Sequence, residues 1–255
     1  DRYIETHIIK KLPANWKVSA EAFLEAYHVL ETHSEGVYTA GDANADYDIF
    51  GDHISRFIHT IGYTSPHITE NRPSEQEILD MLLGKRTKEG SGQTLPEGST
   101  AREVYAENVQ ETMKEKFKQD FSHLTVTETI DSIEYFAFPN AFFFPGLQLS
   151  MVYRFRPNGV DGALFDLLFL RPKPVEGPCP PPPEPFELEI EDSYTKCPGT
   201  EFLGAVYDQD TNNLLSQTKG FKSSFKKGQS LGNYQEARTR HFHQTVDKYL
   251  EKSNG

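Results

Sequence analysis

The stretch SIEYFAFPNAFFFPGLQLSMVYRFRPNGVDGALFDLLFLR, residues 132–171, decides the fold class. Aromatic and β-branched residues dominate it, and turn residues interrupt it at Pro139-Asn140 and Pro157-Asn158-Gly159. This pattern predicts three strands, over Ser132–Phe138, Phe142–Phe155 and Gly162–Arg171. Strands so close in sequence pair in antiparallel fashion, because parallel pairing needs long crossover connections. The segment therefore indicates an antiparallel sheet.

Further elements flank this segment on both sides. Additional strands are predicted over residues 3–10, Asp46–Phe50, Phe57–Ile61, Leu124–Glu128 and Thr200–Tyr207. Helices are predicted over Ser19–Leu30, after Ser74, after Thr100 and over Asn233–Lys252; Ser74-Glu75-Gln76-Glu77 is a capping-box pattern. Residues 172–185 hold eight of the sixteen prolines and predict an extended loop. The sequence as a whole predicts an α+β fold, with helices packed on one antiparallel sheet.

Composition excludes several classes of function. The 255 residues carry 38 Asp and Glu against 26 Lys and Arg, a formal net charge of -12. Nucleic acids and anionic membranes require a basic surface, and no apolar run is long enough to span a bilayer. The two cysteines, Cys179 and Cys197, are too few for a disulfide scaffold and favour the reducing cytoplasm. The chain starts at Asp1 with neither an initiator Met nor signal-peptide character, so we expect it to be part of a longer protein.

The segment from Glu25 to His33 is the strongest local cluster of chemically active residues. Glu25 precedes His28 by three residues, so on a helix it could hydrogen-bond that imidazole. His28 and His33 would point about 140° apart on a regular helix. They would converge on one ion only if the helix ended or distorted between them. Spacing alone therefore favours structural histidines at a helix end over a metal site.

A second candidate is Asp208-Gln209-Asp210, at a predicted strand-to-helix junction. A carboxylate there could complete a face of two His and one carboxylate, which leaves positions open for oxygen. Asp is equally suited to a turn or a helix N-cap, and taken alone this segment favours that interpretation.

Several blocks, in order along nearly the whole chain, resemble Rieske-type aromatic-ring-hydroxylating oxygenases. They are Asn15-Trp16-Lys17, Glu21–His28 followed by His33, Phe138-Pro139-Asn140, Gln209-Asp210 followed by Gly220–Ser223, and Glu236 with His241–Leu250. Two positions depart from the family pattern, Ala22 where Asn is common and Glu25 where Asp is usual. Neither departure removes a metal ligand.

The resemblance implies that residues 1–255 form the catalytic domain of an α subunit. Its fold would be a helix-grip (START/Bet v 1-like) domain, whose curved antiparallel sheet encloses an apolar cavity. Mononuclear non-haem Fe(II) would be held by His28, His33 and Asp210, with Asp208 as the second choice for the carboxylate. Glu25 matches the family's bridging acid, which carries electrons to the iron from a neighbouring subunit's Rieske cluster.

The reaction implied is hydroxylation or cis-dihydroxylation of an aromatic or other apolar substrate by O₂. Electrons would come from NAD(P)H through a reductase, in some members a ferredoxin, and the Rieske [2Fe–2S] cluster. We expect Phe23, Leu24, Val29 and Phe143 beside the substrate. Phe142-Phe143-Phe144 lies in a predicted strand whose alternate members face opposite sides. The implied assembly is a homotrimer or α₃β₃, and the implied role is catabolism of aromatic compounds.

The family's N-terminal Rieske domain is missing from this sequence. Its CxH…CxxH motif cannot be formed here, since neither Cys179 nor Cys197 has a His beside it. We therefore expect that the isolated chain cannot sustain turnover.

Two other functions are compatible with the same residues. A non-enzymatic helix-grip module would bind a hydrophobic small molecule in the same cavity without a metal. A zinc hydrolase could use the same three ligands with Glu25 as general base, although the surroundings of Glu25 do not suggest a hydrolytic substrate.

Overall fold

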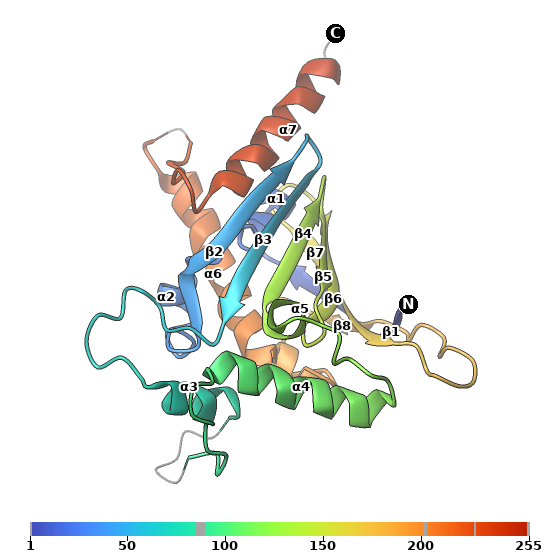
Figure 1. Cartoon of the computed structure of the whole chain (residues 1–255). Coiled ribbons are helices and arrows are strands. Elements are labelled where there is room, and N and C mark those ends of the chain that lie inside the picture. The colour runs from blue at the N-terminus through green and yellow to red at the C-terminus, as the bar shows by residue number, and fades with distance from the viewer. Residues whose placement is uncertain (1, 85–89, 201–202, 227, 254–255) are drawn as a thin grey trace.

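An eight-stranded sheet forms the frame of the protein. The computed structural model describes residues 2–84, 90–200, 203–226 and 228–253. Along the sheet the strand order is β2-β3-β4-β5-β6-β7-β1-β8. The strands are β1 (Arg2–Leu12), β2 (Ala40–Phe50), β3 (Ile54–Ile61), β4 (Ser132–Ala137), β5 (Ala141–Pro145), β6 (Ser150–Pro157), β7 (Ala163–Pro172) and β8 (Phe186–Leu188). Only β8 pairs in parallel, on β1, and the other pairings are antiparallel. The sheet is curved and does not close into a barrel (Figure 1).

Helices cover the sheet and one of its ends. They are α1 (Trp16–Glu21), α2 (Val29–Thr32), α3 (Glu75–Leu82), α4 (Ala101–Phe117), α5 (Val126–Ile130), the 3-10 turn η1 (Tyr194–Lys196), α6 (Gly204–Ser223) and α7 (Ala237–Ser253). Residues of α1, α6 and α7 join the inward side chains of β4–β7 in one hydrophobic core. Helices α3 and α4 lie together below the end of the sheet (Figure 1). The α+β, helix-grip-like architecture predicted from the sequence is confirmed.

Aromatic side chains fill the core between sheet and helices. Phe155 and Phe165, on neighbouring strands, stack with ring centroids 4.5 Å apart. Phe242 of α7 meets Phe136 of β4 edge to face at 5.7 Å. Each such pair adds about 0.5–1.5 kcal/mol to the effect of burial itself. The aromatic residues that identified the strands thus also hold the helices on the sheet.

Residues 124–128 were predicted as a strand, and this prediction is wrong. Thr125 is the N-cap of α5: its side chain accepts from the Glu128 N–H, and the Glu128 carboxylate accepts from the Thr125 N–H. Thr-x-x-Glu is a capping-box signal that could have identified this helix from the sequence. One strand was predicted over Phe142–Phe155, but this stretch forms two, because Gly146–Leu149 separates β5 from β6.

The predicted strand over Thr200–Tyr207 is also wrong within the described residues, while residues 201 and 202 lie outside them. Helix α6 begins at Gly204, where η1 packs so closely that an added Cβ would lie 3.0 Å from the Thr195 backbone nitrogen. Asp208, Gln209 and Asp210 therefore lie within a helix and not at a strand-to-helix junction. Residues two apart on a helix point about 200° apart, so the two carboxylates face different surroundings.

The predicted helix over Ser19–Leu30 is broken in two. Helix α1 ends at Glu21 and α2 begins at Val29, and residues 22–28 form a turn between them. Contacts from distant segments hold this turn. The Tyr47 hydroxyl accepts from the Ala26 N–H, and Arg238 of α7 donates to the Leu24 carbonyl. Both contacts depend on residues far away in the sequence, and periodicity cannot reveal them.

Replacing Thr100 by Ala is expected to destabilise the protein by about 1 kcal/mol. The Thr100 hydroxyl accepts from the Glu103 N–H at the start of α4, and the Glu103 carboxylate accepts from the Thr100 N–H. Urea unfolding followed by circular dichroism measures the effect. Thr94→Ala, in the exposed preceding loop, is the control. Equal unfolding midpoints for the two variants would show that the cap contributes nothing.

Candidate metal centre

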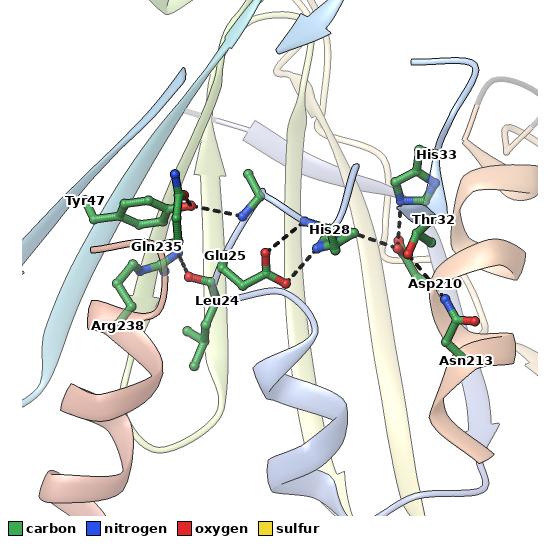
Figure 2. A network of polar contacts seen from close by, with 11 residues as sticks. Leu24, Glu25, His28, Thr32, His33, Tyr47, Asp210, Asn213, Gln235 and Arg238 are labelled. Atoms are coloured by element: carbon green, nitrogen blue, oxygen red, sulfur yellow. Dashed lines mark hydrogen bonds and ion pairs between the residues drawn. The ribbon is translucent and has the colours of Figure 1, made fainter. Parts of the chain in front are cut away.

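Three side chains from α2 and α6 converge at one point beneath the sheet. His28 and His33 stand at the two ends of α2, as its N-cap and C-cap, and Asp210 lies in α6. Their candidate ligand atoms all lie within 4.8 Å of one another. Oδ1 of Asp210 is 2.8 Å from Nε2 of His33 and 3.4 Å from Nε2 of His28. Figure 2 shows Asp210 between the two imidazole rings, with Glu25 on the other side of His28.

The short length of α2 allows the two histidines to meet. His33 leaves helical geometry, with φ −121° and ψ 55°, so the regular 140° separation does not apply to it. The two rings lie 5.4 Å apart at an interplanar angle of 65°. From the sequence pattern alone, the two histidines could converge only if the helix ended or distorted between them. The structure shows that α2 ends at His33.

Each imidazole is oriented through its second nitrogen. His28 Nδ1–H donates to Oε1 of Glu25 over 2.8 Å, and the His28 backbone N–H donates to Oε2. His33 Nδ1–H donates to Oε1 of Gln209 over 2.7 Å. The Gln209 amide is itself oriented, because its Nε2 donates to Glu35. The Nδ1 atoms are donors because a carboxylate and an amide carbonyl only accept.

This orientation makes the site electron-rich. With a proton on Nδ1, each imidazole turns Nε2 toward the Asp210 carboxylate, where Nε2 either carries a second proton or offers its lone pair to a cation. Burial lowers the pKa of His28, but hydrogen bonds to Asp210 and Glu25 outweigh burial and raise the pKa to about 10. Burial raises the pKa of Asp210, but the two histidines outweigh it and hold that pKa below its ordinary value. The site therefore favours a positive charge at its centre.

The three residues fit a divalent metal ion. Two Nε2 lone pairs and a carboxylate oxygen pointing at one another repel unless a cation or protons separate them. Two His and one carboxylate on one side of an ion match the ligand set of non-haem Fe(II) centres. The partners at Nδ1 are the outer-shell groups that such ligands require. His28, His33 and Asp210 are thus the residues that would hold the metal.

Asp208, the second choice for the carboxylate, points away from this centre. Its two oxygens accept from the Ser193 hydroxyl and the Tyr194 N–H, which fixes η1 against α6. Gln209 is a functional residue whose role sequence reasoning missed. Its position beside Asp210 was the only signal, and nothing in the sequence pairs it with His33.

A cavity of about 420 Å³ opens onto the three candidate ligands. Its apolar lining includes Phe23, Val29, Phe57, Phe144, Met151 and Tyr153. Phe23 and Val29, which the resemblance implied to lie beside the substrate, line this cavity. The placement of Leu24 and Phe143 beside the substrate is wrong. Leu24 is fully buried in the core and does not line the cavity, while Phe143 points to the other face of β5 and is 44% exposed.

In the described part of the chain, no helix combines the length and apolar character needed to cross a membrane.

Comparison with known proteins places this site in a family. The family model described as ring hydroxylating alpha subunit (catalytic domain) matches residues 2–252. A search of curated proteins gives no match. One similar solved structure is a quaternary ammonium Rieske monooxygenase linked to carnitine oxidation by gut microbiota. It is 13% identical with a TM-score of 0.54, and the alignment covers 97% of this chain and 50% of that one.

A second is a naphthalene 1,2-dioxygenase variant bound to phenanthrene, 11% identical with a TM-score of 0.51, over 98% of this chain and 55% of that one. This chain thus spans about half the length of the solved structures that it matches. At such identity these structures show a shared fold. The family match covers nearly the whole sequence, and this chain therefore belongs to the ring hydroxylating alpha subunit family, in the region of its catalytic domain.

Proposed function

We propose that this chain is the catalytic domain of an oxygenase that hydroxylates or cis-dihydroxylates an aromatic or other apolar substrate. The observation that carries the proposal is the convergence of His28, His33 and Asp210 at the mouth of an apolar cavity. When bound there, Fe(II) would supply the open coordination positions and the redox chemistry that O₂ requires. Zinc could occupy the same ligands, but the family match favours iron over the hydrolase alternative.

The protein side chains would orient the metal ligands, enclose the substrate and exclude water. Glu25 and Gln209 hold a proton on Nδ1 of each imidazole, so that both Nε2 atoms face the metal position as potential ligands. Phe23, Val29 and Phe144 present apolar surface on the cavity side of the ligands. Such a lining would hold an apolar substrate near the metal by burying it from water. It would also limit the access of bulk water to the reacting centre.

Glu25 is proposed as the entry point of electrons. Its side chain is 12% exposed, and both of its oxygens accept from His28. The electrons would come from NAD(P)H through a reductase, with or without a ferredoxin, and a Rieske [2Fe–2S] cluster. Inter-subunit electron transfer is described for the carnitine-oxidising relative. A homotrimer or α₃β₃ assembly here would bring a neighbour's cluster to Glu25.

The [2Fe–2S] cluster would lie outside these 255 residues. The sequence contains two cysteines, and both Cys179 and Cys197 are free. Free thiols agree with a reducing cytoplasmic location, which we propose for this protein.

Anaerobic titration with Fe(II), followed by an assay for hydroxylated product, tests the proposal. We expect one Fe(II) per chain, lost in His28→Ala, and NAD(P)H-dependent product when reductase and a Rieske partner are supplied. Chain that folds but takes up no Fe(II) would overturn the proposal. Ligand binding that survives replacement of His28, His33 and Asp210, without turnover, would instead indicate the non-enzymatic binding module.

Replacing Glu25 by Gln is expected to weaken Fe(II) binding by about 10–100-fold, the usual cost of losing an outer-shell partner. The variant replaces a charged acceptor with an amide, so His28 loses the negative charge that makes it a better ligand. Competition with a metal-sensitive chelator measures the change. Glu31→Gln, exposed on α2, is the matched control. Equal affinity of the two variants would refute the orienting role of Glu25.

A further inference from the structure

One wall of the cavity is polar, and the metal centre does not account for it. In the ladder between β3 and β4, His59 lies opposite Ser132, and Phe57 lies opposite Glu134. Two-residue alternation places these four side chains on the same face of the sheet. All four line the cavity. Three of them are polar, which is unusual on the inner face of a sheet otherwise packed with aromatics.

Glu134 is the centre of this wall. It is 1% exposed, and Arg238 Nη2 donates to its Oε1 over 2.6 Å. Among the residues that the structure describes, no donor reaches its second oxygen, Oε2. Burial raises the pKa of Glu134 to about 7, against the opposing effect of Arg238. A carboxylate that lines a cavity and has one protein donor can gain free energy from a donor group of a bound ligand.

Ser132 and His59 extend the same surface. Among the described residues, His59 Nε2 is a buried atom without a hydrogen-bond partner, and the Ser132 side chain lines the cavity beside it. Both residues are buried, with Ser132 9% and His59 8% exposed. Burial lowers the pKa of His59 to about 4, so its ring is a neutral imidazole. Three adjacent positions thus combine burial with polarity, and His59 adds a nitrogen whose hydrogen-bonding capacity is unmet.

The opposite wall is apolar. Phe144 of β5 and Met151 and Tyr153 of β6 face the cavity, and Phe23 closes it from the α1 side. None of the described Lys or Arg side chains lines the cavity, whereas Glu25, Glu35 and Glu134 do. A substrate carboxylate would find no cation there apart from the metal itself, and would meet three acidic side chains.

We propose that Glu134, Ser132 and His59 form a polar subsite for a hydrogen-bond-donating group of the substrate, a hydroxyl or an amine. The substrate would be amphipathic, with its apolar ring or chain against Phe144, Met151 and Tyr153. Glu134 is a specificity residue here, because its free oxygen accepts from the donor and repels an anion. This inference deepens the proposed function and rests on it, since it names the substrate class of the same cavity.

Binding of four related probes to the whole chain tests the inference by calorimetry. The probes are 2-phenylethylamine, 2-phenylethanol, propylbenzene and 3-phenylpropanoate, which share a phenyl group and differ at the end of the chain. We expect the amine or the alcohol to bind about tenfold or more tightly than propylbenzene, and 3-phenylpropanoate to bind most weakly. The stronger of the first two identifies the donor. Equal binding of all four, or preference for the carboxylate, would overturn the inference.

Variants assign the preference to the proposed residues. Glu134→Gln should reduce binding of the preferred probe several-fold and leave propylbenzene unchanged, with exposed Glu111→Gln as its control. Glu134→Gln leaves the buried charge of Arg238 without its partner, which destabilises the fold. Ser132→Ala, which removes only a hydroxyl, therefore provides a second test, with exposed Ser253→Ala as its control. A preference unaffected by Ser132→Ala and by any folded Glu134→Gln would refute the subsite.

Fe(II) titration of the same samples separates the outcomes. Normal Fe(II) uptake without probe preference refutes the subsite alone, and probe preference without Fe(II) uptake refutes the oxygenase proposal alone.

Discussion

Asp210→Asn is expected to lose Fe(II) affinity by more than 100-fold. Among the residues that the structure describes, Asp210 Oδ1 is the one anionic atom that faces both imidazole Nε2 atoms, at 2.8 and 3.4 Å. Loss of an outer-shell partner already costs about 10–100-fold, and a ligand itself must cost more. The amide also removes the negative charge that favours a cation at this point. Metal content after desalting, with chelator competition, measures the loss.

Asp208→Asn is the matched control for this experiment. It makes the same chemical change on the same helix, two residues away, where the carboxylate accepts from Ser193 and Tyr194. We expect this variant to retain Fe(II) and to show only reduced stability of the contact between η1 and α6. Loss of Fe(II) in Asp208→Asn with retention in Asp210→Asn would reverse the ligand assignment. Retention in both would mean that neither carboxylate binds the metal.

Short sequence patterns correctly predicted those elements whose structure depends on residues close together in the sequence. The capping box at Ser74 begins α3 as expected, and the turn at Pro157-Asn158-Gly159 connects β6 and β7. The proline-rich segment after β7 carries no helix or strand over residues 173–185. In each case the deciding residues lie within a few positions of one another, so the pattern contains the information needed.

The sequence pattern could not predict which side chains of β5 face the cavity. Phe142, Phe143 and Phe144 are equally apolar, so hydrophobic alternation cannot decide which of them face inward. The ladder places Phe143 opposite Tyr135 and Val152 on the outer face, while Phe144 lines the cavity. A shift of one residue exchanges the two faces of a strand, which is why the cavity residue was misassigned by one position.

The break between α1 and α2 was hidden for a different reason. Apolar spacing from Phe23 to Leu30 fits one helix, and local preference gives no cause to interrupt it. The cause is a pair of tertiary hydrogen bonds. The Tyr47 hydroxyl accepts from the Ala26 N–H, and Arg238 donates to the Leu24 carbonyl. The resemblance to the oxygenase family nevertheless named His28, His33 and Asp210 together, because motif order carries spatial information that helical periodicity lacks.

Arg238 connects this turn to the polar wall of the cavity. It is fully buried, and it donates to Glu134, to the Ser55 hydroxyl and to the Leu24 carbonyl next to Glu25. Its guanidinium also lies over the Phe57 ring, 4.9 Å from the centroid. One side chain of α7 thus joins β3, β4 and the segment that leads to the metal ligands.

Arg238→Met is therefore expected to destabilise the protein by about 3–5 kcal/mol, because Glu134 is left as an unpaired buried charge. The double variant Arg238→Met with Glu134→Leu removes both charges and should recover most of that loss, since a buried ion pair is often replaceable by apolar residues of similar volume. Urea unfolding of the four members of this cycle measures the coupling. Lys248→Met, also on α7 but in an exposed pair with Asp52, should change stability little. If the single and double variants are equally unstable, the cost lies in the lost contacts to Ser55 and Leu24 and not in the unpaired carboxylate. Recovery in the double variant would show that the buried pair is not needed for stability. The reason for a charge at this position would then be the role of Glu134 in the cavity, as an acceptor for the substrate.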